Sequence, residues 1–326
     1  MINRLSDKHP GTQPVRVLQH NITKQFEDTT PDFIQLTLNT AINKGLKLGI
    51  GYFVNEEPIT FKVGGHIQTP YVDRTKKIHI HETFLSYVWS ICYSLIVLYD
   101  EAVAKPQQNA FLGEEINKID LEKIAKAQEL FNYGISLITL FSKWDKENLP
   151  NPEYYREEDE FYIERVNALY VYAMNFILCH EFVHVEREHI DQLINHTATN
   201  SNILDFEKEA DKKAIELILS GVSDEKRKTA IGGILAGLCC LLYFKNETLN
   251  HTHPDTDKRI DNFLTIVNAE SDDPVWGVAA LAYKLWDNQF SKSFNYPTQV
   301  NDFKEMYLWF KTIIEEENKV ARTRNP

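Results

Sequence analysis

The stretch "ILCHEFVHVEREHI" (residues 177–190) decides the fold, because it ends a long helical pattern and places His180 and His184 one turn apart. We expect a helix over residues 157–188, which begins in the acidic run "REEDE", where negative charge favours a helix N-terminus. An apolar stripe on this helix leads onto both histidines, so the pair points into the core rather than to solvent. The stripe consists of Tyr162, Val166, Leu169, Ala173, Phe176 and Ile177.

The motif HExxH at residues 180–184 has the spacing of a zinc site. Side chains at i and i+4 are neighbours on a helix, so the imidazoles of His180 and His184 can bind one zinc ion. Glu181 then reaches the water that the metal activates, and takes its proton as that water attacks a carbonyl group. The alternative is a pair of core histidines bonded to the backbone, with Glu181 an ordinary helix charge. HExxH alone leaves that alternative open, because five-residue patterns recur by accident.

A second amphipathic helix, "DFEKEADKKAIELIL" (205–219), predicts the third zinc ligand. Glu207 and Asp211 lie one turn apart, which suits one carboxylate on the metal and another that accepts the free N–H of a ligand histidine. At about 100° per residue, Glu207 lies close to the apolar direction of this helix, whereas Glu209 should face water. His189 would be about 140° round from the second histidine if the first helix continued, so we do not expect it to be the third ligand. Together the two segments predict one Zn²⁺ per chain; a solvated charged face is the alternative for the second helix.

Composition limits the classes of function. The 326 residues are 43% hydrophobic, which is enough for a sizeable core, and we expect one large globular unit. The formal net charge of −12 opposes binding to nucleic acid or anionic lipid, and no basic stripe in the sequence overrides it. We therefore expect neither a nucleic acid nor a membrane as a partner.

The cysteines and the N-terminus predict a cytoplasmic protein. The four cysteines lie in apolar surroundings without the CxxC spacing of a zinc or redox motif, which indicates buried, reduced thiols. Residues 1–20 lack the apolar segment of a signal peptide. The uncharged stretches at 83–99 and 230–244 are diluted by polar residues or too short for a membrane span, so we expect buried core helices there.

Three motifs, in order, resemble those of known zinc peptidases: HExxH, ExxAD at residues 207–211, and "THPDTDKRI" at 252–260. The same set occurs in membrane zinc peptidases of the HtpX and prenyl-protein-processing type, whose transmembrane helices are missing here. The chain more closely resembles the soluble Lit family of phage-exclusion peptidases, which share these motifs and an uncharged Tyr- and Trp-containing helix after a strand. That helix corresponds to "HIHETFLSYVW" (79–89), and the loop "KWDKENLPNPEYY" (143–155) resembles the family's Trp- and Pro-rich loop. The resemblance spans about residues 50–265.

The resemblance implies a gluzincin-like zinc endopeptidase of mobile-element origin. Family members cleave elongation factor Tu, a host translation factor, when a phage component activates them, and the block in translation aborts the infection. Carried over to this chain, the family implies a cellular protein as the substrate and a phage-derived or defence-system activator. Neither the composition nor the motif spacing identifies the substrate.

The third motif adds two candidate catalytic residues beside Glu181. His253, Pro254 and Arg259 match the family's third stretch, which implies that they fold back near the metal. The proline fixes the chain next to His253, and either His253 or Arg259 could donate a hydrogen bond to the oxyanion of the tetrahedral intermediate. The alternative is a loop histidine and an arginine that pairs with the acidic surface.

The predicted fold class is α+β, mainly helical and zincin-like, with a small antiparallel sheet packed beside the HExxH helix. The segments "GIGYFV", "ITFKV" and "KIHIH", between residues 48 and 81, carry β-branched and aromatic residues separated by turn signals. Helices are expected at about residues 82–104 and 115–143. The expected parts of the chain are an N-terminal extension (1–45), a zinc metallopeptidase domain (46–265) and a C-terminal helical segment packed on the same unit (266–326).

The strand "KIHIH" is a candidate for substrate binding, because zinc peptidases of this class commonly bind substrate as an extra strand at a sheet edge. An ordinary structural strand is the alternative. The residues concerned are Lys77, Ile78, His79, Ile80 and His81.

Three functions fit the sequence. The first is a regulated zinc endopeptidase that cleaves a cellular protein. The second is a zinc peptidase that cleaves a bound repressor or partner protein; such proteins usually carry a DNA-binding or sensor domain, which is not evident in this sequence. The third is a non-catalytic, zinc-stabilised interaction protein. Glu181 argues against the third, because a structural site closes all four zinc positions with protein ligands and needs no base.

Overall fold

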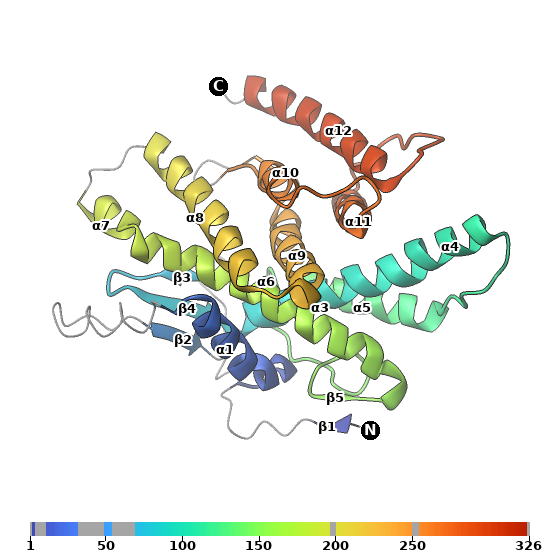
Figure 1. The fold of residues 1–326 in the computed structure, drawn as a ribbon, viewed down its shortest axis with the longest axis horizontal. Coiled ribbons are helices and arrows are strands. Elements are labelled where there is room, and N and C mark those ends of the chain that lie inside the picture. Colours follow the sequence, from blue (N-terminus) through green and yellow to red (C-terminus); the bar gives the residue numbers. More distant parts are fainter. Residues whose placement is uncertain are drawn as a thin grey trace.

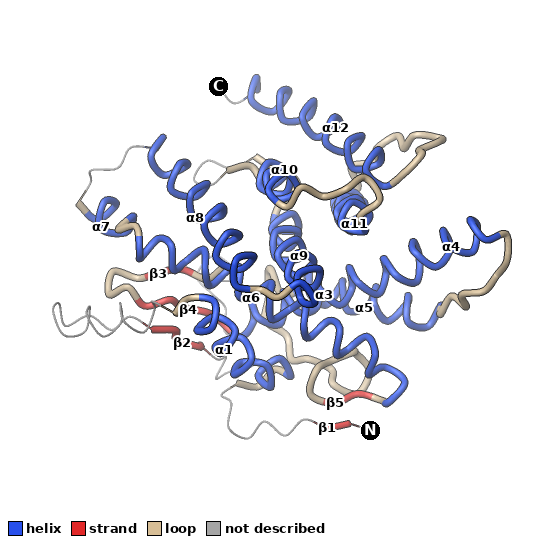
Figure 2. Tube along the Cα trace, in the orientation of Figure 1, coloured by secondary structure: helices blue, strands red, loops and turns tan. Residues whose placement is uncertain are grey.

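Helices form most of this protein, and Figure 2 shows its few strands at one side and near the N-terminus. In a computed structural model of the chain, 70% of the described residues are helical and three strands form one small mixed sheet, which confirms the predicted mainly helical α+β class. The structure describes residues 2–3, 11–31, 49–53, 69–195, 200–249 and 254–324.

The helices of the described residues are α1 (Gln19–Thr29), α3 (Glu82–Tyr99), α4 (Lys105–Leu112), α5 (Leu121–Ser136), α6 (Glu160–Glu186), α7 (His189–Ile194), α8 (Asn200–Gly221), α9 (Asp224–Cys239), α10 (Thr256–Ile266), α11 (Pro274–Phe290) and α12 (Phe303–Arg324). Short 3-10 segments are η1 (Pro14–Leu18), η3 (Glu157–Asp159) and η4 (Cys240–Phe244), and the π-helical segment η2 (Asp100–Ala104) joins α3 to α4. The strands are β1 (Ile2–Asn3), β2 (Gly49–Phe53), β3 (Tyr71–Val72), β4 (Lys77–His81) and β5 (Tyr154–Tyr155).

Helix α6 is the central element of the fold (Figure 1). It packs against α1, α3, α8 and α9, so it has neighbours on several sides. A helix that is apolar on most of its faces is a buried helix, and the side chains of α6 are buried along most of its length. The acidic segment η3 precedes it, where negative charge favours the positive end of the helix dipole. The HExxH motif therefore lies on a rigid element in the interior of the protein.

Helices α6 and α9 cross so closely that the contact requires a glycine. A Cβ atom at Gly233 would lie 2.5 Å from the carbonyl oxygen of Leu169 and 2.5 Å from Cβ of Tyr172, both on α6. Side chains do not approach one another so closely, so the absence of a Cβ atom lets the two backbones meet. The uncharged run at 230–244 is accordingly a mostly buried helix, as the sequence predicts.

The three-stranded sheet has the order β2–β4–β3 and is mixed, because β2 runs parallel to β4 while β3 runs antiparallel to it. The prediction of an antiparallel sheet is therefore wrong. A tight turn at residues 73–76 joins β3 to β4 and makes that pair antiparallel, whereas residues 54–76 separate β2 from β4 and are long enough for a parallel connection. Residues 59–63, which were expected to form a strand, lie outside the described residues.

Strand β4 lies in the middle of the sheet, so the predicted edge position of residues 77–81 is also wrong. Its main chain pairs with β2 along its whole length, and with β3 at Ile78 and His79. The alternation along β4 buries Ile78 and Ile80 and leaves His79 half-buried. Strands β2 and β3 are the two edge strands, and β3 contacts α6.

Two helices differ in length from the predicted ones. The helix expected at 82–104 continues through η2 into α4 and ends before Gly113, whose φ of 70° suits a helix C-terminus. The helix expected at 115–143 is shorter, because the side chain of Asp120 accepts the backbone N–H of Lys123 and starts α5 there.

Within the described residues, three helical runs are long and apolar enough to cross a membrane, by length and composition only: Glu82–Leu112, Glu157–Glu186 and Asp224–Phe244. In this fold 89%, 78% and 61% of their most apolar windows are buried inside the protein, so these apolar side chains are packed within the fold itself. The uncharged stretches at 83–99 and 230–244 belong to the first and third of these runs.

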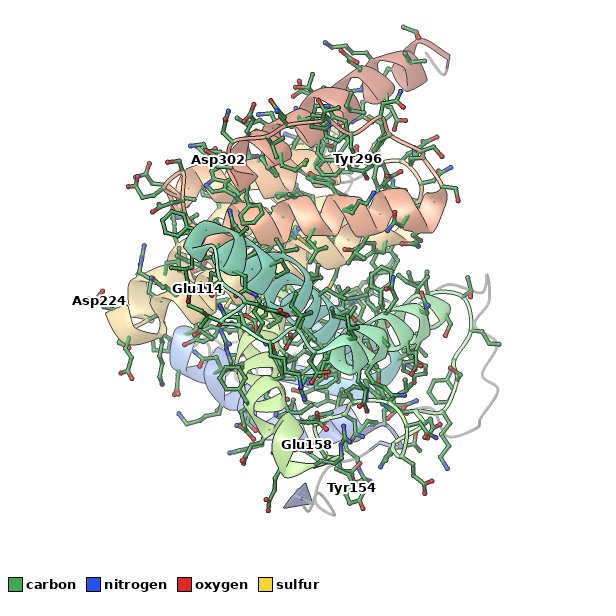
Figure 3. The ribbon with its side chains drawn as sticks, turned by 90° about the vertical axis from the view of Figure 1, so that its right-hand side faces the viewer. Glu114, Tyr154, Glu158, Asp224, Tyr296 and Asp302 are labelled. Atoms are coloured by element: carbon green, nitrogen blue, oxygen red, sulfur yellow. The ribbon has the colours of Figure 1, made fainter. Side chains whose placement is uncertain are left out.

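Helices from both ends of the chain pack on this helical body. Helix α1 lies against α6, where Phe26 and Phe182 meet edge to face with ring centroids 6.0 Å apart. Helix α11 packs on α3 and α9, and α12 packs on α11. Figure 3 shows α11 and α12 as a layer above the other helices, with Tyr296 and Asp302 in the connection between them. The boundaries expected at residues 45 and 265 stay predictions.

Candidate active site

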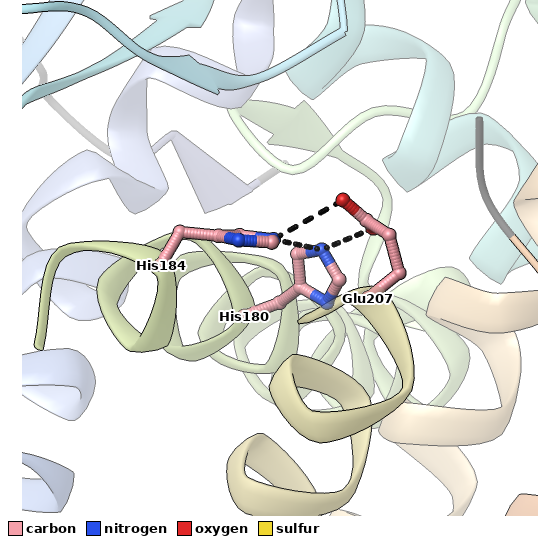
Figure 4. A group of neighbouring side chains, drawn as sticks. All are labelled: His180, His184 and Glu207. Carbon is pink, nitrogen blue, oxygen red and sulfur yellow. Dashed lines mark hydrogen bonds and ion pairs between the residues drawn. The ribbon is translucent and has the colours of Figure 1, made fainter. Parts of the chain in front are cut away.

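The candidate site lies where α8 packs on the C-terminal part of α6 (Figure 4). Helix α8 buries Ala210 and Ala214 completely, and these small side chains allow the two helices to approach. Glu207 and Asp211 lie beside this contact and are buried, with 8% and 9% of their surface exposed. The side chain of Glu209 is 41% exposed. The structure thus turns Glu207 inward and Glu209 outward, which is the orientation that helical periodicity predicts.

The side chains of His180, His184 and Glu207 converge with the spacing of a tetrahedral metal centre (Figure 4). Nε2 of His180 and Nε2 of His184 lie 3.2 Å apart. Oε2 of Glu207 lies 3.2 Å from Nε2 of His180, and its Oε1 lies 3.4 Å from Nε2 of His184. Zinc–ligand distances of about 2.0–2.1 Å at tetrahedral angles place ligand atoms about 3.3 Å apart, so the site fits a zinc ion. In the described part of the chain, these three buried side chains form the group of His, Cys, Asp or Glu residues that could hold a metal ion.

Asp211 and Arg259 hold the ring of His180 in place. Nδ1 of His180 lies 2.9 Å from Oδ1 of Asp211. Arg259, on α10, donates to the same carboxylate through Nε at 2.7 Å and through Nη2 at 2.6 Å. This bidentate pair fixes Asp211, and Asp211 in turn directs Nε2 of His180 toward the metal position. Arg259 therefore pairs with a buried acid and not with the acidic surface, while its oxyanion role stays a prediction.

The charges in this cluster depend on one another. Burial opposes ionisation of Asp211, but Arg259 and His180 hold the pKa of its carboxyl well below the usual value. Burial also opposes protonation of His180, yet its hydrogen bonds to Asp211 and Glu207 raise its pKa to about 10. Because only a deprotonated nitrogen binds a metal ion, a metal at this site competes with a proton on Nε2 of His180.

Glu181 lines a cavity beside the metal position. The cavity has a volume of about 250 Å³, and the polar side chains that line it include His180, Glu181 and Arg259. Its apolar walls include Phe84, Phe176, Ile177, Leu241 and Phe244. Burial, opposed in part by the charge of His180, raises the pKa of Glu181 to about 7. A carboxylate with a pKa near neutral is well matched to general acid–base catalysis.

His189 is a neighbour of the site that the sequence did not indicate. Helix α6 ends at Glu186, and Glu188 adopts a left-handed conformation with φ of 56°, so α7 starts in a new direction. The turn brings Nδ1 of His189 to 3.2 Å from Nδ1 of His184, and the His189 ring is buried. The assumption that the helix continues to His189 is therefore wrong, while the expectation that His189 is not the third zinc ligand stays a prediction. Residues 186–188 contain no Gly, Asn or Pro, so the sequence held no stop signal.

The remaining predicted residues are not brought into the metal-binding group. His253 lies outside the described residues, so its catalytic role stays a prediction. In β4, Nε2 of His79 lies 2.6 Å from Oδ2 of Asp73, and His81 caps the N-terminus of α3. Both histidines therefore have structural partners, and substrate binding by residues 77–81 stays a prediction.

Comparison with known proteins points to one family. A family model described as Peptidase U49 matches residues 78–279, which is more than half of the chain. The matched span runs from β4 to α11, so it contains HExxH, ExxAD and Arg259. No curated protein and no solved structure matches this chain.

Proposed function

The chain belongs to the Peptidase U49 family, the Lit peptidase family, and we propose that it is a zinc-dependent endopeptidase with His180, His184 and Glu207 as metal ligands. The observation that carries the proposal is that Nε2 of His180 and Nε2 of His184 lie 3.2 Å apart, and that each lies 3.2 to 3.4 Å from a carboxylate oxygen of the buried Glu207. That spacing suits a tetrahedral zinc ion. Membership of a peptidase family supports peptide-bond hydrolysis as the reaction.

Glu181, Asp211 and Arg259 have different roles in the proposed reaction. Zinc, when bound, supplies a Lewis acid that polarises a carbonyl and makes water a nucleophile near neutral pH. Glu181 takes the proton from the attacking water and passes it to the leaving amine, for which its pKa of about 7 suits it. Asp211 positions His180 for the metal. Arg259 also lines the cavity, so its remaining N–H groups, together with His253, are the proposed donors to the oxyanion.

A purely structural zinc ion is a weaker alternative for this site. Structural sites fill all four zinc positions with protein ligands, whereas the metal-binding group found among the described residues has three members. A general base next to the first ligand, lining a cavity, has no use at a closed site.

The cavity beside Glu181 favours an apolar side chain next to the bond that is cleaved. Its apolar walls come from α3, α6 and η4. Its volume of about 250 Å³ lies below the range of about 300–1,000 Å³ typical of small-molecule pockets. A single side chain of a protein substrate fits such a space better than a whole small molecule does.

We further propose that the substrate is a cellular protein, with elongation factor Tu as the first candidate, and that its cleavage in the cytoplasm aborts phage infection. The family membership supports this proposal. A phage-derived or defence-system activator would then start the cleavage, and the reaction needs neither a nucleic acid nor a membrane as a partner.

The test compares wild type with Glu181→Gln in host cells, with and without phage, by sequencing the new N-termini of cellular proteins. We expect new termini during infection with the wild type alone, and termini in elongation factor Tu if the family's target is kept. New termini in a repressor or another partner protein, instead of in elongation factor Tu, would identify that protein as the substrate. Equal cleavage by wild type and Glu181→Gln, or no cleavage by either, would contradict the proposed peptidase.

A further inference from the structure

The two metal-binding histidines differ in what holds their second ring nitrogen. Nδ1 of His180 faces the carboxylate of Asp211. Nδ1 of His184 instead lies 3.2 Å from Nδ1 of a third histidine, His189. A histidine that binds a metal almost always donates its other N–H to an acceptor, which fixes both the tautomer and the orientation of the ring. For His184, His189 stands in the place of that acceptor.

Three interactions hold His189 in this position. Its ring stacks on Phe206 of α8, with centroids 4.1 Å apart and an angle of 13° between the planes. Its Nε2 lies 3.5 Å from Oε2 of Glu209, also on α8. Helix α7 is tied to the β3–β4 turn by an ion pair of 2.8 Å between Asp191 and Lys76. The ring is only 2% exposed, so its orientation is set by packing on every side.

The chemistry of imidazole fixes the direction of the hydrogen bond between the two rings. His184 must present a lone pair on Nε2 to bind a metal, so in its neutral form the proton is on Nδ1. His189 must then accept that N–H with its own Nδ1, and its proton lies on Nε2, on the side of Glu209. His189 is therefore not a further ligand, because it contacts the nitrogen of His184 that faces away from Glu207.

We propose that His189 is a positioning residue for His184, which it holds in the tautomer and orientation that bind zinc, as Asp211 does for His180. The inference rests on the zinc site of the proposed function. A neutral imidazole does this without adding a further negative charge to a site that already contains Glu207 and Asp211.

Two substitutions separate this role from simple packing. His189→Phe keeps a planar ring on Phe206 but removes the acceptor. His189→Asn loses the ring but can place its amide oxygen where Nδ1 lies, because an amide is both a donor and an acceptor. His189→Leu, a smaller side chain without an acceptor, replaces the phenylalanine variant if that variant does not fold.

The experiment measures the zinc affinity of the purified full chain by competition with a chromogenic chelator. The visible spectrum of the cobalt-substituted protein reports the ligand geometry, and the thermal midpoint of the metal-free protein reports folding. We expect His189→Phe to bind zinc about 10- to 100-fold more weakly, with a changed cobalt spectrum and a metal-free midpoint near that of wild type. His189→Asn should bind zinc nearly as tightly as wild type.

Two results would overturn the inference: zinc affinity of the wild-type level in His189→Phe, or an affinity in His189→Asn as weak as that of the phenylalanine variant. The zinc content of the wild-type protein distinguishes failure of this inference from failure of the proposed function. If it binds no stoichiometric zinc, the proposed function fails as well; if it binds zinc and His189→Phe does too, only the role of His189 is lost.

Discussion

Glu181 meets two requirements of a general base: it lines the reaction cavity, and its pKa lies near neutral. Both follow from its place on α6, one residue after His180, where its half-buried side chain lies in the cavity wall. The same burial has a consequence for stability that can be measured without any substrate.

Burial raises the folded-state pKa of Glu181 from 4.5 to about 7, so its contribution to stability is present below pH 4.5 and is lost as the pH rises through about 7. Glu181→Gln has no charge to bury. The metal-free variant should therefore be more stable than the metal-free wild type at about pH 8, and by a larger margin than at about pH 5.5. Thermal midpoints from circular dichroism would show this, and an equal margin at both pH values would contradict the raised pKa.

Arg259 and Asp211 form a buried ion pair, with side chains 9% and 12% exposed, whose loss should cost stability. Removing one partner leaves the other charge buried, and such changes cost about 3–5 kcal/mol. We expect Arg259→Met to lower the free energy of unfolding of the metal-free protein by about 3 kcal/mol. This value is at the lower end of that range because Asp211 keeps His180 as a second partner.

A matched control is Arg187→Met, since Arg187 pairs with exposed glutamates and its own side chain is 44% exposed. Its loss should cost about 0–1 kcal/mol. Denaturant titrations of both variants give the comparison. Equal, small losses would mean that the pair between Arg259 and Asp211 does not hold the site together.

The close crossing of α6 and α9 depends on the absence of a side chain at Gly233. A methyl group at Gly233 would meet the backbone of α6, which cannot move aside as a flexible side chain can. We expect Gly233→Ala to destabilise the protein by about 1–3 kcal/mol or more, as other overpacked cores are destabilised. Gly221→Ala, at the end of α8 where a Cβ meets nothing within 4 Å, is the control and should have little effect. If both variants unfold at the same denaturant concentration, α6 and α9 can accommodate a methyl group at residue 233, and the close contact described here would be contradicted.

Helical periodicity predicted the elements that carry the ligands, because α6 and α8 each bury one side and the ligands lie on it. His180, His184 and Glu207 could be placed in this way. The partner of His184 could not, because the left-handed Glu188 breaks the helix where no breaker residue stands. The parallel pairing of β2 was also hidden, since alternation along a strand has the same period in parallel and antiparallel sheets. The pairing of Arg259 with Asp211 required the path of the chain between α8 and α10.

Across the whole chain, the site joins segments that are distant in sequence. Two ligands come from α6 and one from α8, while α7 and α10 supply their supporting side chains. The family match at residues 78–279 contains all of these elements, and α1 and α12 lie outside it. A metal ion bound by these three side chains would therefore link the central helix α6 to α8.

We expect zinc to stabilise the folded chain as a whole. A ligand that binds only the folded state adds about 4 kcal/mol of stability when its concentration is a thousandfold above its dissociation constant. Removing zinc with a chelator should lower the thermal midpoint of the wild type and leave that of His180→Ala unchanged. A midpoint of the wild type that does not respond to chelation would contradict a zinc ion bound by α6 and α8.

The measurement that tests the central claim most directly is the zinc content of the purified protein, determined by mass spectrometry of the metal for three matched chains. We predict one zinc ion per chain in the wild type, none in Glu207→Gln, and the wild-type amount in Glu209→Gln, whose side chain points to solvent. A wild type without stoichiometric zinc, or a loss of zinc in Glu209→Gln but not in Glu207→Gln, would contradict the site described for His180, His184 and Glu207.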